Sequence, residues 1–254
     1  MRGGAQGHLM RGADGGFYVV KFQNNPQHVR VLANELLGTR LGEHVGLPVA
    51  APAIVEVDEW LVRMTPELNI QLAGSTIACC AGLQFGSRYV VDPLAGQALD
   101  YLPEVLLPRV KNVAAFAGML ALDKWTSNAN GRQAVFWRKS RERRYSVAFI
   151  DQGYCFNAGE WTFPDSPLRG IYSRNQVYGE VSGWEGFEPW LSRIESLDAA
   201  TIGEIAASVP LDWYGDWEAM ERLVQTLAQR RARVRELISD FRRSSRQPFP
   251  NWKD

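Results

Sequence analysis

Cysteine and histidine are both scarce in this sequence, and their scarcity excludes several kinds of functional site. The 254 residues include three histidines, scattered without regular spacing, and three cysteines, Cys79, Cys80 and Cys155. Adjacent cysteines rarely pair with each other, and no cysteines or histidines have the spacing of zinc ligands. An odd cysteine count without a disulfide framework is typical of a reducing compartment, so we expect a cytoplasmic protein.

The sequence also lacks an excess of charge and a long apolar run. It contains 28 basic and 28 acidic residues, so its net charge gives no reason to expect binding to nucleic acid or to an anionic membrane. Basic residues do gather at 138–144 and 230–246, which we interpret as a solvated hairpin and a solvated helix face. No signal peptide or membrane-length apolar segment is present, so we expect no contact with a membrane.

The first segment with a distinct pattern is a Gly-rich opening followed by an apolar run. Residues 1–16 read MRGGAQGHLMRGADGG, and FYVVKF follows. We predict two strands, 7–12 and 16–22, joined by an Asp-Gly-Gly turn, because these turn residues tolerate positive φ. Lys21 is the one charged residue in the apolar run. A buried lysine without a partner is costly, so we expect a partner nearby.

The next segment predicts a helix that supplies this partner. Apolar residues recur at helical spacing over 28–45, and a Gly-Leu-Pro sequence ends the pattern. Glu35 lies beside the apolar stripe, so we expect its side chain to face the sheet. The sequence therefore predicts an ion pair between Lys21 and Glu35.

A second hairpin and a connector are expected to complete a small lobe. Residues 53–57 and 59–64 read AIVEV and EWLVRM about a Val-Asp-Glu turn. The connector that follows closes the lobe near residue 68. Glycine and proline recur over 69–100, so we expect no long element there.

The chain that follows predicts mainly helices and one hairpin. A helix is predicted over 104–121, and it runs into Asp123 and a polar loop, SNANGR. A hairpin comes next, AVFWRK and YSVAFID, which ends on Asp151. The last segments are 157–190, which predicts no element, and two helices near 191–208 and 217–243.

The order of these pieces is the one that phosphoryl transfer requires. That chemistry needs a flexible cradle over the phosphates, a fixed cation with a partner, and carboxylates for magnesium and the acceptor. A carboxylate that ends a buried strand, as Asp151 does, is well placed to bind a metal, with help from Asn128. Other interpretations stay open, because Asp123 at a helix end and the loop residues Asn128 and Asn130 are also common turn formers.

Together these features resemble the protein-kinase-like fold, and more closely the HipA-like kinases of bacteria, which are similar to phosphatidylinositol 4-kinases. The resemblance rests on the Gly-rich hairpin, FYVVKF, NELLG, DKWTSNANGRQ and FIDQG, and it covers most of residues 1–155. It implies an α+β, bilobal fold with a small β-rich lobe that has one helix, residues 1–68, and a larger, mainly helical lobe, residues 69–254. Since the chain begins at the Gly-rich turn, we expect the strand before it to be absent or very short.

The resemblance also implies roles for individual residues in binding ATP and magnesium. In that family the strand lysine contacts the nucleotide phosphates and the helix glutamate holds it, which correspond to Lys21 and Glu35. The Gly-rich hairpin caps the phosphates, and the carboxylate of the second hairpin holds the metal. The residues implied for these roles and for catalysis are Gly3, Gly4 and Gly7 for the phosphates, Asp151 and Asn128 for the metal, and Asp123 and Asn130 for the acceptor.

The sequence departs from the family pattern at the catalytic position. Asn130 stands where the family has a catalytic Asp, and an amide cannot accept a proton at neutral pH. The second metal-binding Asn of the family falls near Val135, where no Asn is present.

We therefore hold two main hypotheses about function. The first is an ATP-dependent phosphotransferase with an unknown protein or small-molecule acceptor, in which Asp123 could replace the base. The second is a nucleotide-binding pseudokinase or a partner-binding regulatory module with little or no turnover. A lipid kinase is less favoured, because neither a basic excess nor an amphipathic membrane anchor is visible.

Overall fold

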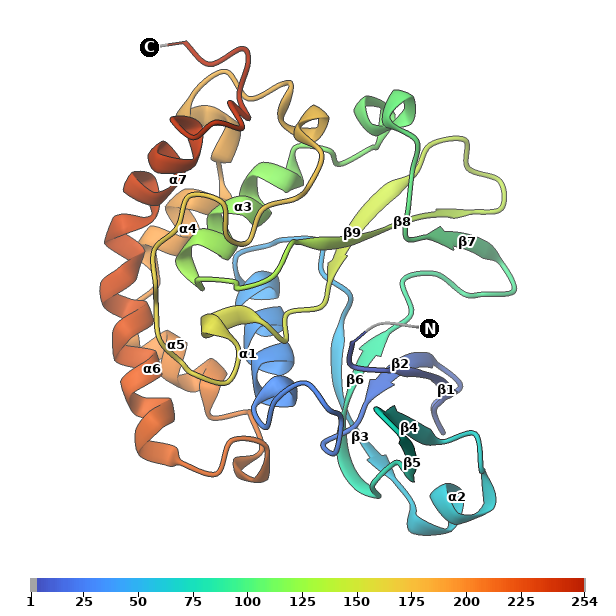
Figure 1. The fold of residues 1–254 in the computed structure, drawn as a ribbon. Helices are drawn as coiled ribbons and strands as arrows, with labels where there is room; N and C mark the ends of the chain where they lie inside the picture. Colours follow the sequence, from blue (N-terminus) through green and yellow to red (C-terminus); the bar gives the residue numbers. More distant parts are fainter. Residues whose placement is uncertain (1–3, 254) are drawn as a thin grey trace.

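The computed structural model describes residues 4–253. A small lobe built mainly of strands lies beside a larger lobe that is mainly helical (Figure 1). The α+β, two-lobed architecture predicted from the sequence is therefore confirmed. Within the described residues, no helix is both long enough and apolar enough to cross a membrane.

Four antiparallel strands form the sheet of the small lobe, in the order β1-β2-β6-β3. They are β1 (His8–Arg11), β2 (Phe17–Lys21), β3 (Pro52–Val57) and β6 (Gly82–Arg88). The β1–β2 turn is closed by Asp14, whose Oδ1 accepts a hydrogen bond of 2.9 Å from the Gly16 N–H, and Gly15 has a φ of 79°. This is the hairpin chemistry that the Asp-Gly-Gly sequence predicted. β2 lies between β1 and β6, and its last residue, Lys21, pairs with Phe85 of β6.

Helix α1 (Val31–His44) packs against this sheet and is buried along most of its length. It lies between β3 and β6 of the small lobe and helix α5 (Ala199–Ala206) of the large lobe (Figure 1). A helix enclosed in this way is apolar around most of its circumference. Its buried polar residues include Asn34 and Glu35, so their partners must come from neighbouring elements.

Residues 59–64 form a helix rather than the predicted strand. Helix α2 (Glu59–Met64) begins after Asp58, whose Oδ1 accepts a hydrogen bond of 2.7 Å from the Trp60 N–H. This N-cap satisfies one of the unpaired donors of the first helical turn. It favours the helix over the strand that the apolar residues suggested.

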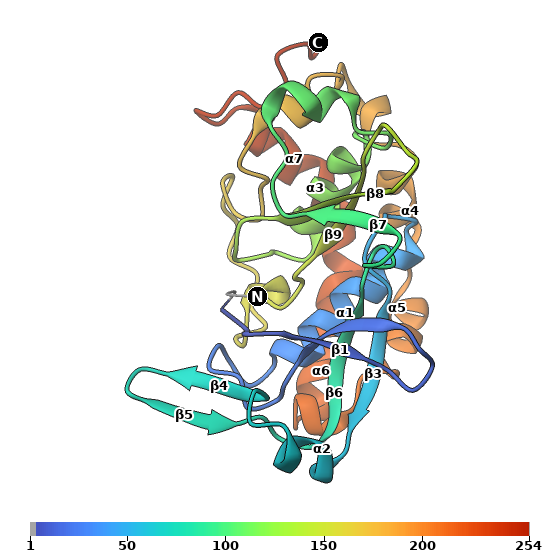
Figure 2. The same cartoon turned by 90° about the vertical axis from the view of Figure 1, so that its right-hand side faces the viewer.

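Residues 69–100, expected to hold no long element, contribute four strands. β4 (Asn69–Leu72) and β5 (Ser75–Ala78) form a separate two-stranded sheet, β6 joins the main sheet, and β7 (Gly96–Leu99) belongs to a third sheet (Figure 2). Gly86 does not break its strand: a Cβ there would lie 2.5 Å from Val55 Cγ2, so this glycine permits close packing within the sheet. The division after residue 68 stays a prediction, although a lobe defined by its sheet extends to Arg88.

The third sheet has the order β7-β8-β9 and is separate from the sheet of the small lobe. β8 (Gln133–Lys139) and β9 (Ser146–Ile150) are the predicted hairpin. Backbone hydrogen bonds tie β9 to the connection after α1, because the Phe149 N–H donates to the Pro48 carbonyl at 2.8 Å and the Ala50 N–H donates to the Phe149 carbonyl at 3.1 Å. One continuous sheet would have contradicted a kinase-like fold, and the two sheets are distinct.

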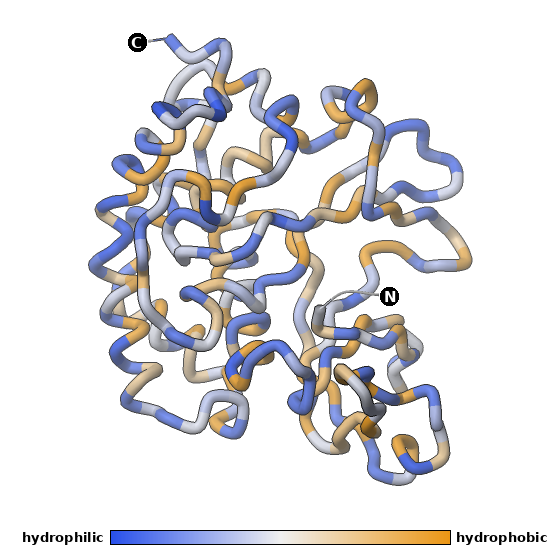
Figure 3. Tube along the Cα trace, in the orientation of Figure 1, coloured by the Kyte–Doolittle hydropathy of each residue, from blue (hydrophilic) through white to orange (hydrophobic). Residues whose placement is uncertain are grey.

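The large lobe is built around α3 (Ala115–Trp125), which is buried at every residue. The other helices of this lobe are α4 (Trp190–Ser196), α5, α6 (Trp217–Arg230) and α7 (Val234–Arg242). The predicted helix over 104–121 is wrong in its first half, because Pro108 lies in a short 3₁₀ segment, Glu104–Arg109, and α3 begins only later. Hydrophobic and hydrophilic residues alternate along α6 and α7 (Figure 3), and α7 packs on α3.

A continuous cluster of buried apolar residues runs through both lobes. It extends from α1 and Phe85 in the small lobe to α3, α6 and α7 in the large lobe. A smaller cluster, which includes Val20, Phe22 and Ile70, lies between β2 and the β4–β5 hairpin. The two lobes therefore share one core, whereas the hairpin has a separate one.

Replacing Gly118 by alanine tests the packing of α3. A Cβ at Gly118 would lie 2.3 Å from Cδ2 of Trp190, so the indole must shift. Overpacking costs about 1–3 kcal/mol, which exceeds the roughly 1 kcal/mol that alanine gains over glycine in a helix. We expect Gly118→Ala to lower the free energy of unfolding in urea, measured by circular dichroism.

Gly203→Ala in α5 is the matched control. The nearest atom to a Cβ there, Cγ1 of Val224, is 4.0 Å away, so the methyl group has room. This variant should leave the free energy of unfolding unchanged or raise it. Equal effects at the two glycines would contradict the packing of α3 against Trp190.

Candidate active site

Lys21 lies at the centre of three charged side chains that come from three different elements. Its Nζ forms an ion pair with Oε1 of Glu35 on α1 and a second one, of 2.7 Å, with Oδ1 of Asp151 just after β9. The Lys21 side chain is 12% exposed and that of Glu35 is 2% exposed. The predicted pair of Lys21 and Glu35 is therefore present, and Asp151 joins it to form a cluster of three.

Burial and mutual attraction set the charges of this cluster. Burial raises the pKa of Glu35 to about 6, although Lys21 opposes the shift. Burial acts to lower the pKa of Lys21, but the two carboxylates outweigh it and raise that pKa above its ordinary value. Burial acts to raise the pKa of Asp151, but Lys21 holds it below its usual range. The charges of the three groups therefore depend on one another, and the lysine favours the ionised form of both carboxylates.

The backbone around Asp151 brings its carboxylate to Lys21. Asp151 has a φ of 66°, which is uncommon for a residue with a side chain. The N–H of Gln152 donates to Oε2 of Glu35 at 2.9 Å, so this glutamate holds both the lysine and the turn. A Cβ at Gly153 would lie 2.9 Å from Oε1 of Glu35. The Asp-Gln-Gly sequence thus fits tightly against α1 and requires glycine at its third position.

Asp123 is committed to a buried ion pair and does not join the cluster. Arg132 donates from Nε to Asp123 Oδ2 at 2.9 Å and from Nη2 to Asp123 Oδ1 at 2.5 Å, and both side chains are 1% exposed. A bidentate pair of this kind strongly fixes the geometry. Arg132 also donates to the Ile150 carbonyl at 2.7 Å. The pair of Asp123 and Arg132 therefore closes the polar loop, and Arg132 connects it to the end of β9. Asp123 would have to leave this pair in order to act on a substrate.

Asn128 and Asn130 were expected to lie with Asp151, but their side chains form their hydrogen bonds within the loop 123–132. Asn128 Nδ2 donates to Asp123 Oδ1 at 2.9 Å, and Asn128 Oδ1 accepts from the Asn130 N–H at 3.0 Å. Asn130 is exposed, and its Oδ1 accepts from the next N–H of the chain at 2.9 Å. These side chains face the interior of the loop because the buried guanidinium of Arg132 pairs with Asp123, and Asn128 is hydrogen-bonded to Asp123.

Gln133 contacts the carboxylate of Asp151 through its side chain. Its Nε2 donates to Asp151 Oδ2, while Oδ1 accepts from Lys21. The β8–β9 register places Gln133 opposite Ile150, directly before Asp151. The contact could have been predicted from the hairpin, because antiparallel pairing brings the first residue of one strand beside the last residue of the other.

The Gly-rich turn, residues 4–7 in the described part of the chain, passes beside Lys21. Gly3 is outside the described residues. A Cβ at Gly7 would lie 3.7 Å from Lys21 Cγ, so the turn passes close to the lysine stem. A Cβ at Gly4 would lie 2.6 Å from Gln27 Nε2, so this glycine packs against the segment that leads to α1. The role of these glycines in binding phosphates stays a prediction.

Asn34 holds the segment after Asp151 against α1. Its Nδ2 donates to three carbonyls, those of Gly153 at 3.0 Å, Cys155 at 2.9 Å and Ala158 at 2.7 Å. Its Oδ1 accepts a hydrogen bond of 2.8 Å from the indole N–H of Trp161. Residues 156–158 each have a φ of 58°, a conformation that persists only where the surroundings fix it. An asparagine inside an apolar helix was the signal in the sequence for this contact, which the sequence analysis missed.

Two basic residues of the large lobe hold the next part of this segment. Lys124 Nζ donates to the carbonyls of Pro167 and Arg169 at 2.7 Å each, and Arg230 forms an ion pair of 2.6 Å with Asp165. Lys124 is 4% exposed and Arg230 is 7% exposed. Burial lowers the pKa of Lys124 to about 8. The segment is therefore fixed along its length, first by α1 and then by α3 and α6.

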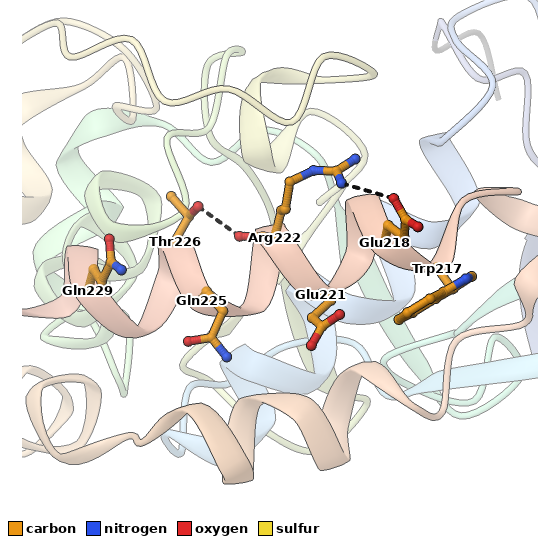
Figure 4. Close-up of a pocket in the computed structure, with 7 residues that line it drawn as sticks. All are labelled: Trp217, Glu218, Glu221, Arg222, Gln225, Thr226 and Gln229. Carbon is orange, nitrogen blue, oxygen red and sulfur yellow. Dashed lines mark hydrogen bonds and ion pairs between the residues drawn. The ribbon is translucent and has the colours of Figure 1, made fainter.

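A broad open groove lies apart from this site, along the outer face of α6 (Figure 4). Its lining residues all come from this one helix: Trp217, Glu218, Glu221, Arg222, Gln225, Thr226 and Gln229. None of them belongs to an element that carries Lys21, Glu35 or Asp151. Small-molecule sites are concave and bury most of the ligand, whereas one helix face leaves a ligand open to solvent, so we do not assign this groove to the site.

Solved structures of kinases share the arrangement of this chain. The Helicobacter pylori proinflammatory kinase CtkA is 14% identical, with a TM-score of 0.56, over 92% of this chain and 93% of that chain. The Golgi casein kinase is 12% identical, with a TM-score of 0.53, over 96% of this chain and 72% of that chain. A structure of the Golgi casein kinase with Mn/ADP bound is 14% identical, with a TM-score of 0.50, over 97% of this chain and 72% of that chain. The fold is thus the bilobal, kinase-like fold.

The family follows from the sequence match. A family model described as HipA-like kinase matches residues 1–244. The chain therefore belongs to the HipA-like kinase family, and the resemblance stated from its motifs is confirmed. No curated protein matches the chain.

Asp123→Asn tests the structural role of the buried pair. Asparagine cannot supply the charge that Arg132 needs, and a buried guanidinium left unpaired costs about 3–5 kcal/mol. We expect the free energy of unfolding to fall by about that amount, measured by tryptophan fluorescence in urea. Glu218→Gln is the control, since Glu218 pairs with Arg222 at 3.6 Å on the exposed face of α6 and should change stability by less than about 1 kcal/mol. A loss of activity in Asp123→Asn at unchanged stability would instead favour a catalytic role.

The lowered pKa of Lys124 predicts a pH dependence of stability. In the folded protein the amine loses its proton near pH 8, whereas in the unfolded chain it keeps the proton up to its ordinary pKa of 10.5. Between these values the unfolded state binds more protons, so the stability contributed by this group rises with pH. The quantity to measure is the free energy of unfolding of the wild type minus that of Lys124→Met. We expect this difference to increase by up to about 3 kcal/mol between about pH 8 and about pH 10.

Urea denaturation at each pH measures this difference. Taking the difference between the two proteins removes the groups that titrate in both. A difference that stays flat over this range would show that Lys124 has its ordinary pKa in the folded protein.

Proposed function

We propose that this protein is an ATP-dependent phosphotransferase. The observation that carries the proposal is the cluster of Lys21, Glu35 and Asp151, which joins the small sheet, α1 and the end of β9. A buried lysine held by a glutamate, beside a carboxylate and a Gly-rich turn, is the arrangement that phosphoryl transfer from a nucleotide uses. Membership of a kinase family supports the proposal.

Lys21 would bind the nucleotide phosphates while Glu35 holds it in place. The Lys21 amine is shared between two carboxylates, so it can exchange Asp151 for a phosphate oxygen and keep Glu35 as its partner. Backbone N–H groups of the Gly-rich turn would cap the phosphates. The Mn/ADP bound to the Golgi casein kinase supports a nucleotide and a divalent cation as ligands of this fold.

The donors around Asp151 fit a magnesium ion that binds together with the nucleotide. Magnesium prefers hard oxygen ligands and is usually held by one or two carboxylates and the substrate phosphates. Among the described residues, no three His, Cys, Asp or Glu side chains form a metal site of their own. The proposed protein ligand is the carboxylate of Asp151, to which the Gln133 amide nitrogen donates a hydrogen bond. The oxygen of Asn128 accepts one backbone hydrogen bond, and its second lone pair leaves it a candidate for the second ligand. The ion would neutralise charge on the phosphates.

The acceptor side of the site has no free carboxylate in the loop 123–132. Asp123 is paired with Arg132, and Asn130 is an exposed amide. Phosphoryl transfer depends mainly on positioning and electrostatic stabilisation, so the lack of a base slows the reaction without removing the remaining machinery. The same observation favours a second candidate function, a nucleotide-binding pseudokinase or partner-binding regulatory module with little turnover.

We propose a protein or a small molecule as the acceptor and a bacterial cytoplasm as the location. The neutral charge balance of the chain gives no support for a nucleic acid. The cysteines Cys79, Cys80 and Cys155 are free, which suits a reducing compartment.

Thermal shift with ATP tests the proposed ligand. We expect ATP with magnesium to raise the melting temperature, because a ligand that binds the folded state stabilises it. Asp151→Asn removes the charge that holds the ion and should abolish the additional effect of magnesium. Asp212→Asn, at an exposed position of the large lobe, is the control and should behave as the wild type does. If ATP leaves the melting temperature of the wild type unchanged with and without magnesium, the proposed function is wrong.

Turnover then separates the two candidate functions. A general base contributes about 10²–10⁴ in rate, so Asn130→Asp should raise the rate of ADP formation by about a hundredfold or more. We expect slow ADP formation by the wild type. A wild type that binds ATP and forms no ADP, but gains turnover in Asn130→Asp, is a pseudokinase. An unchanged rate in Asn130→Asp would show that position 130 does not lie at the acceptor.

A further inference from the structure

The hairpin of β4 and β5 projects from the small lobe (Figure 2). It is a separate two-stranded sheet, and all four residues of β5 are exposed. An isolated two-stranded hairpin is at best marginally stable in water. At its base, Ile70 and Cys79 pack into the small cluster with Val20 and Phe22. Beyond this base, the hairpin depends on polar contacts.

Two side chains from the start of the chain bind the free edge of β4. Gln6 Nε2 donates to the Gln71 carbonyl at 2.7 Å, and the Gln71 N–H donates to Gln6 Oε1 at 2.8 Å. One amide thereby satisfies both backbone groups of Gln71, as a neighbouring strand would. Two residues further along, His8 Nε2 donates to the Asn69 carbonyl at 3.0 Å. The contacts run antiparallel, so side chains take the place of a strand at this edge.

Gln6 adopts a backbone conformation that needs such a contact. Its φ is 49°, in the left-handed region, where a glutamine is uncommon. Conformations of this kind persist only when the surrounding structure fixes them. The pairing with Gln71 is the contact that fixes Gln6. Without it, the backbone of the Gly-rich turn gains other conformations.

The turn fixed in this way lies directly beside the lysine of the site. His8 pairs with Val20 in the β1–β2 register, so the residues that precede His8 pass Lys21. A Cβ at Gly7 would lie 3.7 Å from Lys21 Cγ. Gln6 is therefore next to the place where phosphates lie if Lys21 binds them. The β4–β5 hairpin and the nucleotide site thus share one segment of backbone.

We infer that the β4–β5 hairpin is a clamp for the Gly-rich turn, with Gln6 and His8 as positioning residues for the nucleotide phosphates. The inference rests on the proposed function, because it takes ATP to bind at Lys21. The clamp keeps the N–H groups of the turn in one conformation, so less conformational entropy is lost when phosphates bind. Its effect should be limited to ligands that carry phosphates, because the turn is expected to contact the phosphates and not the nucleoside.

Two substitutions break the clamp in different ways, and a third is a matched control. Gln6→Ala removes the amide side chain. Gln71→Pro removes the N–H that donates to Gln6, and this N–H faces the open edge of β4, where proline is tolerated. Gln71→Ala keeps both backbone groups and removes only the side chain, whose hydrogen bonds to Asn69 and Thr76 lie within the hairpin.

Calorimetric affinities for ATP with magnesium and for adenosine give the first readout. We expect Gln6→Ala and Gln71→Pro to bind ATP about tenfold more weakly than the wild type. A tenfold change in affinity corresponds to the free energy of one or two hydrogen bonds. Both variants should bind adenosine as the wild type does. Gln71→Ala should bind both ligands within about twofold of the wild type.

Hydrogen exchange of the amides of residues 5–8 gives a second readout that needs no nucleotide. Exchange reports local opening of the backbone. It should be faster in Gln6→Ala and Gln71→Pro than in the wild type, and unchanged in Gln71→Ala. Unchanged exchange in Gln6→Ala would show that the hairpin does not hold the turn, and would overturn the inference.

The outcomes distinguish failure of this inference from failure of the proposed function. If the wild type does not bind ATP, the proposed function is wrong, and hydrogen exchange alone decides whether the hairpin holds the turn. If the wild type binds ATP and Gln6→Ala binds it equally well, the clamp is overturned. An equal loss of ATP and adenosine also overturns it, because the damage is then to the whole lobe. If Gln71→Pro does not fold, Gln6→Ala and Gln71→Ala remain as the deciding pair.

Discussion

Lys21 carries its charge into a largely buried position, and a charge removed from water has to be paired. Its partners come from α1 and from the end of β9, so elements that are far apart in the sequence must meet at one point. Because Glu35 also accepts the N–H of Gln152, one glutamate fixes both the lysine and the turn that presents Asp151. The pairing of Lys21 thus ties the small sheet, α1 and the end of β9 together at one point.

A second buried ion pair supports the first from the large lobe. Arg132 binds Asp123 through two hydrogen bonds and donates to the carbonyl of Ile150, directly before Asp151. Gln133, the next residue, reaches the carboxylate of Asp151. The loop therefore holds both the backbone and the side chain of Asp151, while Lys21 binds the carboxylate from the sheet. The charge of Asp123 is needed to balance a guanidinium that fixes the site, which explains how a loop carboxylate can be structural in a kinase-like fold.

Local patterns predicted the parts of the site that lie on regular elements. A lone lysine in an apolar strand and a glutamate beside an apolar stripe were sufficient for the pair of Lys21 and Glu35, because strand and helix periods fix which way those side chains face. The position of Asp123 was not predictable in this way, since it depends on where Arg132 lies after the loop has folded. The helix at residues 59–64 was missed because the cap formed by Asp58 outweighs the preference of the apolar residues for a strand.

The charges of the cluster explain why nucleotide and metal belong together in the proposed function. The single amine of Lys21 faces two carboxyl groups, so the cluster has more acidic than basic groups. A phosphate that approaches Lys21 competes with Asp151 for the amine and adds negative charge of its own. A divalent cation held by Asp151 would replace the lost partner and offset that charge, so in the proposed function each ligand would lower the electrostatic cost of binding the other. Glu35 would keep its contact with Lys21, so α1 would hold the lysine in place while Asp151 exchanged the amine for the metal ion.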